Sequence, residues 1–193
     1  PKQAVAPDFR DLIERLPFPI AYPWFMSLNT TLHPVQRVNN MIFTAYQAMR
    51  LTGLLLLSDY LESDGNCVTL GRPLGCMRMP HWWDWKYLTD SLAKYLTGKN
   101  ARYAPPTNAL CSQLAKDWMT MASLWRKDAV SVGFKKENGI PSPIEIFQAL
   151  RNDRAHRMGV QDEKGDELEI LERFHPVLRF ALEGLFAARD LCL

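Results

Sequence analysis

The side chains best suited to chemistry lie together in one short segment, Arg151-Asn152-Asp153-Arg154-Ala155-His156. Histidine is the side chain that most readily exchanges a proton near neutral pH, and arginine offers phosphate oxygens a planar fork of N–H donors. Cleavage of RNA without a metal ion needs a base for the ribose 2′-hydroxyl and donors for the charge that builds up on the phosphate. We therefore expect His156 to be the acid or base, Arg151 to hold the phosphate and Asn152 to orient the other groups. Two further arginines flank the histidine and are candidate RNA-binding residues: Arg154 and Arg157.

Helix geometry limits what one copy of this segment can do. On a regular helix, residues five apart lie ~140° around the axis and ~7.5 Å along it, so Arg151 and His156 do not point together. Asn152 and His156 are four apart and share a face. A complete site is expected where the helix unwinds just before Gly159, or where two copies face each other across a dimer interface.

The segment from Gln148 to His156, followed by a polar loop and a long last helix, resembles HEPN domains, which are helical bundles named for nucleotide binding in higher eukaryotes and prokaryotes. The signature of that family is an arginine, a polar residue that is often asparagine, and a histidine further on. Arg151, Asn152 and His156 fit its shortest spacing. The resemblance covers about Ser142 to Leu191, and elsewhere the chain matches only as a helical bundle.

This resemblance implies a cytoplasmic helical domain of a bacterial defence or signalling protein. Many members of the family are metal-independent endoribonucleases that act as homodimers with the motif at the dimer interface, so the implied partners are RNA and a second copy of the chain. No cofactor is expected.

Three other interpretations stay open. Many HEPN domains lack activity, so the chain is also compatible with a non-catalytic module that dimerises or docks a partner domain or protein. A second interpretation is recognition of a nucleotide or RNA without cleavage. The segment is equally compatible with a polar helix end, in which Arg151 pairs with Asp153 or Glu145 and His156 lies near the last carbonyl groups.

The elements that must position the motif are expected to be helical throughout. Apolar residues recur three or four positions apart in six stretches: Pro7–Leu16, Pro34–Glu62, Pro80–Leu96, Thr107–Val130, Ser142–Gly159 and Asp166–Leu191. This pattern predicts a single all-α domain over residues 1–193, a bundle of five to six helices of which two are long. Pro176 predicts a kink or a break in the last helix near Phe174.

The segments between the first three helices carry their own expectations. Pro17, Pro19 and Pro23 predict an extended stretch that lies across the bundle and buries its aromatic side chains. Ser63–Met79 is expected to be a loop in which Val68 to Leu70 can pair briefly as a strand. Leu54 to Leu57 is apolar on every face and is expected at the buried centre of the bundle.

Composition restricts the class of protein. The 193 residues are 47% hydrophobic and 23% charged, as in an ordinary globular domain. A net charge of +2 is too small for a protein that holds nucleic acid by charge alone, although a local basic patch is compatible with it. The four cysteines form no C-x-x-C pair and have no histidine at ligand spacing, which favours reduced thiols over a zinc site or a disulfide framework.

The ends and apolar runs of the sequence suggest a processed or excised piece of a longer protein that does not span a membrane. The chain begins Pro1-Lys2 without a methionine and shows no signal peptide pattern. Its longest strongly apolar run, Leu51 to Leu57, is far shorter than the roughly 20 residues that a bilayer requires.

Three other histidines are weaker candidates. His175 precedes Pro176 and can approach the motif as an accessory group if the last helix packs near the motif helix. His81 adjoins Trp82 and Trp83, a combination that can stack on bases but that more often belongs to a core or an interface. His33 is expected to begin a helix.

Overall fold

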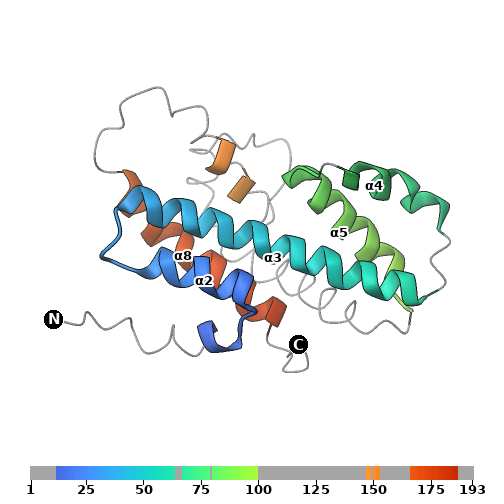
Figure 1. Ribbon diagram of the computed structural model, residues 1–193, viewed down its shortest axis with the longest axis horizontal. Helices are drawn as coiled ribbons and strands as arrows, with labels where there is room; N and C mark the ends of the chain where they lie inside the picture. Colours follow the sequence, from blue (N-terminus) through green and yellow to red (C-terminus); the bar gives the residue numbers. More distant parts are fainter. Residues whose placement is uncertain are drawn as a thin grey trace. The chain divides into compact units, whose positions relative to one another are not determined.

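The computed structural model describes residues 12–63, 67–78, 80–99, 147–148, 150–152 and 166–186. Regular structure in these ranges is helical without any strand, which confirms the expected all-α bundle (Figure 1). The described residues belong to two compact units, one containing residues 12–47 and those from 147 on, the other residues 48–99. The organisation of residues 1–193 as one domain stays a prediction.

Three helices form the first unit: α2 (Phe18–Leu28), the first part of α3 (Pro34–Glu62) and α8 (Asp166–Phe186). Within this unit they lie side by side (Figure 1). Their fully buried side chains include Ile20 and Trp24 from α2, Val38 and Met41 from α3, and Leu182 from α8. The core of the unit is therefore built from all three helices.

The prediction that residues 17–25 are extended is wrong, because α2 covers Phe18–Leu28. Pro17 precedes the helix and Pro19 lies in its first turn, where a backbone N–H has no partner within the helix to lose. Pro23 lies inside the helix and removes one hydrogen bond, a cost of about 3 kcal/mol. Burial of Ile20 and Trp24, each 0% exposed, offsets that cost by about 1.5–3 kcal/mol per large side chain.

The last helix is also more regular than expected. α8 continues from Asp166 to Phe186 through Pro176 without a break. Phe174, Val177 and Leu178 are buried on both sides of the proline. Packing before and after Pro176 holds the two halves of the helix in line, so local sequence does not decide the outcome.

The second unit contains the rest of α3, three short helical turns and α5 (Trp82–Leu96). The turns are η1 (Val68–Leu70), α4 (Gly71–Gly75) and η2 (Cys76–Arg78). They replace the expected loop, and the predicted strand at Val68 to Leu70 is wrong. In a strand, the side chains of Val68 and Leu70 would lie on the same face. Leu70 is buried, whereas Val68 is fully exposed, so the segment does not have the burial pattern of a strand.

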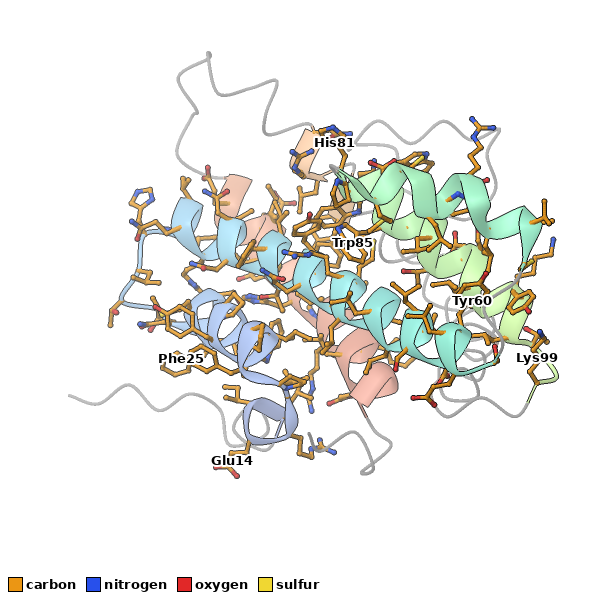
Figure 2. The ribbon with its side chains drawn as sticks, turned by 45° about the vertical axis from the view of Figure 1, so that its right-hand side comes forward. Glu14, Phe25, Tyr60, His81, Trp85 and Lys99 are labelled. Carbon is orange, nitrogen blue, oxygen red and sulfur yellow. The ribbon has the colours of Figure 1, made fainter. Side chains whose placement is uncertain are left out.

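Contacts between α3 and α5 fix the core of the second unit. The guanidinium carbon of Arg50 lies 5.5 Å from the ring centroid of Trp85, and the rings of Tyr60 and Tyr95 meet edge to face at 5.4 Å. Figure 2 shows Trp85 and Tyr60 along this pair of helices. The hydroxyl of Tyr60 also accepts a hydrogen bond from the Cys67 backbone N–H at 3.0 Å, which anchors the chain as it returns from α3.

The long helix α3 is less buried than its apolar run suggests. Leu56 is fully buried, but Leu54 is 47% exposed, so the expectation of burial on every face fails. Among the described helices, α3 alone has the length and the apolar composition needed to cross a membrane. The short apolar run from Leu51 to Leu57 did not indicate this. A core helix passes the same test, and half of the apolar window of α3 is buried inside the protein.

Four of the six expected helices include residues outside the described ranges. Residues 107–130 lie outside them entirely, as do 7–11, 153–159 and 187–191. Within the stretches Pro7–Leu16 and Ser142–Gly159, the described residues 12–15, 147–148 and 150–152 are helical as expected.

Gly53 allows α3 to approach α5 closely, and replacing it should loosen the second unit. A Cβ atom at this position would lie 2.9 Å from Oγ1 of Thr89 and 3.1 Å from Cε3 of Trp85. Alanine normally stabilises a helix relative to glycine by roughly 0.5–1 kcal/mol, but crowding in a packed core costs about 1–3 kcal/mol. We expect Gly53→Ala to lower the free energy of unfolding, measured by urea denaturation.

The matched control is Gly71→Ala in α4, where an added Cβ meets no atom within 4 Å. This variant should be neutral or slightly more stable than the unaltered protein. An increase in stability for Gly53→Ala would contradict the close approach of the two helices.

Candidate functional site

Arg151 and Asn152 lie on the exposed side of a packed helical segment. Phe147 and Leu150 are each 1% exposed, whereas Arg151 and Asn152 are exposed. The Phe147 ring meets the Phe174 ring of α8 at 6.2 Å with an interplanar angle of 62°, so the segment packs on the last helix as expected. Burial of the apolar side leaves the arginine and the asparagine facing solvent.

The Arg151 guanidinium has one hydrogen bond among the described residues. Its Nη1 donates to Oδ1 of Asn152 at 3.3 Å, and no described carboxylate pairs with it. This bond uses one of the five N–H donors of the guanidinium, and no hydrogen bond to another described residue occupies the rest. Asp153 and Glu145, the acids proposed for a purely structural pairing, lie outside the described residues.

The remainder of the predicted site also lies outside the described residues: Arg154, His156 and Arg157. The structure therefore brings together Arg151 and Asn152 of the predicted set. Both belong to regular helix, and the expected separation between Arg151 and His156 stays a prediction because His156 lies outside the described residues.

His175 occupies a polar cluster within the first unit that local sequence does not reveal. Its Nε2 lies 3.2 Å from Oγ of Ser27, and its ring meets the Trp24 ring edge to face at 5.4 Å. Ser27 is fully buried and donates its hydroxyl proton to the Trp24 carbonyl at 2.7 Å. Nε of Arg37 donates to the Ser27 carbonyl at 3.0 Å. One serine thus connects α2, α3 and α8.

The hydrogen bonds of this cluster assign the proton of the imidazole. A hydroxyl has one proton, and that of Ser27 is directed to the Trp24 carbonyl, so Nε2 of His175 must be the donor to Oγ. In this arrangement the histidine cannot accept the serine proton, and the fully buried hydroxyl is closed to a substrate. The pair is therefore a structural link and not a nucleophile with its base.

Burial, and secondarily the positive charge of Arg37, lowers the pKa of His175 from 6.5 to about 4. The imidazole is therefore neutral near pH 7. This property makes it a poor accessory acid for the motif, because a neutral ring at neutral pH has no proton to supply beyond the one already donated to Ser27.

Two helices present exposed aromatic side chains. On α2, Phe18, Tyr22 and Phe25 recur at helical spacing and form the α2 stripe, in which the first two rings stack at 5.9 Å. Figure 2 labels Phe25 on this helix. The expectation that these aromatics are buried is wrong for all three residues, whereas it is right for Trp24, which is 0% exposed.

The α5 stripe comprises Trp83, Tyr87, Asp90 and Lys94, all of them exposed and close to one line along the helix. Trp82 and Trp85 are buried, so adjacent tryptophans have opposite roles that the sequence does not distinguish. His81 precedes the helix, and its backbone N–H donates to Oδ2 of Asp84 at 2.7 Å. His81 and Trp83 are both exposed, so stacking of these rings on bases stays a prediction.

Metal binding finds little support in the part of the chain that the structure covers, and its two cysteines are unpaired thiols. No group of three histidine, cysteine, aspartate or glutamate side chains gathers there. The Thr69 hydroxyl lies 2.9 Å from Sγ of Cys67, and this hydrogen bond lowers the pKa of the thiol. Cys67 and Cys76 are both unpaired.

No family model matches the chain, and neither a curated protein nor a solved structure is similar to it.

The neutral state of His175 predicts a dependence of stability on pH. The unfolded chain binds a proton at this residue below pH 6.5, whereas the folded chain does so only near pH 4. Stability is therefore lost as the pH falls from 6.5 to 4, by at most about 3 kcal/mol from this group. His175→Gln keeps a donor for Ser27 but cannot titrate, so its free energy of unfolding should fall less over this interval.

Urea denaturation between pH 4 and pH 7 measures the difference between the two proteins. His33→Gln removes an exposed imidazole and controls for the loss of a histidine as such. Parallel pH profiles for His175→Gln and the unaltered protein would show that His175 is not the group responsible.

Proposed function

We propose that this chain is a HEPN-like helical module that cleaves RNA without a metal ion and acts as a dimer. The exposed Arg151–Asn152 pair on a packed helix carries the proposal, because a phosphate-binding arginine must face solvent and keep donors available. The resemblance of Arg151, Asn152 and His156 to the HEPN signature supports the same reading.

The chemistry assigns one role to each residue. His156 takes the proton from a ribose 2′-hydroxyl, and the resulting oxygen attacks the adjacent phosphorus as the bond to the 5′-oxygen breaks. The departing 5′-oxygen takes up a proton from water. Arg151 stabilises the charge on the phosphate oxygens, and Asn152 holds the guanidinium or the imidazole in place. Arg154 and Arg157 add positive potential along the strand. The products carry a cyclic phosphate and a 5′-hydroxyl.

The spacing of the motif supports a dimer. Since Arg151 and His156 point apart on a regular helix, each complete site would combine the arginine of one copy with the histidine of the other. A two-fold axis then creates two equivalent sites.

His156→Ala should abolish cleavage of a single-stranded RNA assayed in EDTA. Loss of a general acid or base lowers the rate by roughly a hundredfold or more. Gel electrophoresis with analysis of the product ends measures both the rate and the chemistry. His33→Ala is the control, and equal cleavage by the His156→Ala variant would exclude the role given to this histidine.

Mixing two inactive variants tests whether the site is shared. If each site takes Arg151 from one copy and His156 from the other, the mixed dimer of Arg151→Ala and His156→Ala contains one intact site. Half of the dimers are mixed after exchange, so about a quarter of the original activity should return. No recovery after confirmed exchange of subunits would place the site within one copy.

A second candidate function is that of a non-catalytic module that dimerises or docks a partner. The exposed α2 stripe favours it, since α2 has no charged residue and three of its aromatic side chains face solvent. Large exposed aromatic patches are typical of interaction surfaces.

The α2 stripe predicts self-association that depends on its aromatic rings. The double variant Phe18→Ser with Phe25→Ser should shift a dimer to a monomer in light scattering while the circular dichroism spectrum stays unchanged, because both residues lie outside the core. The control is Val68→Ser, which alters an even more exposed apolar residue elsewhere. A dimer of undiminished stability would exclude the α2 stripe as the interface.

A further inference from the structure

The α5 stripe begins with two exposed aromatic rings one helical turn apart. Trp83 is 53% exposed and Tyr87 is 44% exposed, and residues four apart lie on the same face about 6 Å from each other along the axis. Their neighbours Trp82, Trp85 and Leu88 already supply the buried face of the helix. The two exposed rings are therefore free to meet a flat ligand without disturbing the core.

Lysine side chains lie beside these rings. Nζ of Lys86 is 5.2 Å from the centroid of the Trp83 ring, and Lys94 continues the exposed face two turns beyond Tyr87. Lys99, just beyond the end of the helix, places its Nζ 3.5 Å from the Tyr95 ring (Figure 2 labels Lys99). Lysine ammonium groups thus lie against the rings of Trp83 and Tyr95, while Asp90 places a carboxylate between Tyr87 and Lys94.

Comparison with the α2 stripe separates two kinds of surface. The α2 stripe has three exposed aromatic residues, and no charged residue occurs in α2. The α5 stripe combines two aromatic faces with Asp90 and Lys94, and the ammonium group of Lys86, which pairs with Asp90, lies over Trp83. The two lysines and the one aspartate leave one positive charge in excess. An apolar partner suits the first surface, whereas the second is complementary to a ligand that has both flat rings and negative charge.

Single-stranded nucleic acid has this combination. Its unpaired bases stack on aromatic side chains, and its phosphates bind lysine. We infer that α5 binds single-stranded RNA, with bases stacked on Trp83 and Tyr87 and phosphates at Lys86 and Lys94. The choice of RNA over DNA rests on the proposed function, whereas the stacking and the charge complementarity do not.

Asp90 makes the inference testable in a second direction. Its carboxylate lies within the α5 stripe and pairs with Nζ of Lys86 at 2.7 Å. A phosphate at this position must compete with that carboxylate. Removing the negative charge should therefore strengthen RNA binding, whereas a purely apolar contact at the two rings would not respond in this way.

The experiment measures the affinity of the full chain for fluorescein-labelled poly(U) by fluorescence anisotropy. The 2′-hydroxyls of the probe are methylated, so that it resists cleavage and binding is recorded whether or not the protein is a nuclease. Trp83→Ala should weaken binding about tenfold, within the range for loss of one stacked base. Trp83→Phe should restore most of the affinity, because it retains an aromatic face.

The charge variants complete the test. Asp90→Asn should tighten binding several-fold, and Lys94→Ala should reduce the slope of log affinity against log salt concentration by roughly 0.7, the value for one phosphate contact in a single strand. Phe18→Ala removes an exposed ring from the α2 stripe and should leave the affinity unchanged. Poly(U) annealed to poly(A) should bind weakly, because its bases are enclosed in a duplex.

Unchanged affinity in both Trp83→Ala and Asp90→Asn overturns the inference. Tighter binding of poly(dT) than of methylated poly(U) overturns the assignment to RNA. Loss of self-association in Trp83→Ala with RNA binding intact would instead identify the α5 stripe as a protein interface. Binding of poly(U) through α5 without cleavage of RNA would support this inference and contradict the proposed nuclease activity. Failure of the inference and failure of the proposed function are therefore distinguishable.

Discussion

The first unit depends on the requirement that every polar group around a fully buried serine have a partner. An unsatisfied buried donor or acceptor costs about 1–3 kcal/mol, so the position of Ser27 restricts all three helices that meet there. Its hydroxyl oxygen accepts a hydrogen bond from His175 of α8, and its carbonyl oxygen accepts one from Arg37 of α3. Because Phe174 next to that histidine contacts Phe147, the same constraint orients the segment that carries Arg151.

Sequence periodicity predicts the helices that bury one continuous apolar face. The predictions of α3, α5 and α8 are confirmed for this reason. His33 and Pro34 also mark the beginning of α3 correctly, and Nδ1 of His33 accepts a hydrogen bond from the Val35 N–H there at 3.4 Å. Periodicity fails where tertiary packing outweighs local preference. Burial of Trp24 keeps a proline-rich segment helical, and contacts on both sides of Pro176 prevent a break.

The candidate sites were foreseen to different degrees. The spacing of Arg151 and Asn152 singled them out, because their chemistry is local in sequence. The role of His175 could not be foreseen, since its partner Ser27 is 148 positions away. Nor does the run Trp82-Trp83 indicate which ring is exposed, because this depends on where α5 meets α3 and therefore on the close approach at Gly53.

The positions of the tryptophan side chains make their intrinsic fluorescence a probe of the two units. Trp24 lies in the first unit beside the His175 imidazole, so its emission reports on α2, α3 and α8 together. Trp82 and Trp85 are enclosed in the second unit, whereas Trp83 faces water and is open to dissolved quenchers. Among the tryptophans that the structure describes, iodide should therefore quench Trp83 first, and single-tryptophan variants that keep Trp24 or Trp85 can follow the unfolding of each unit separately.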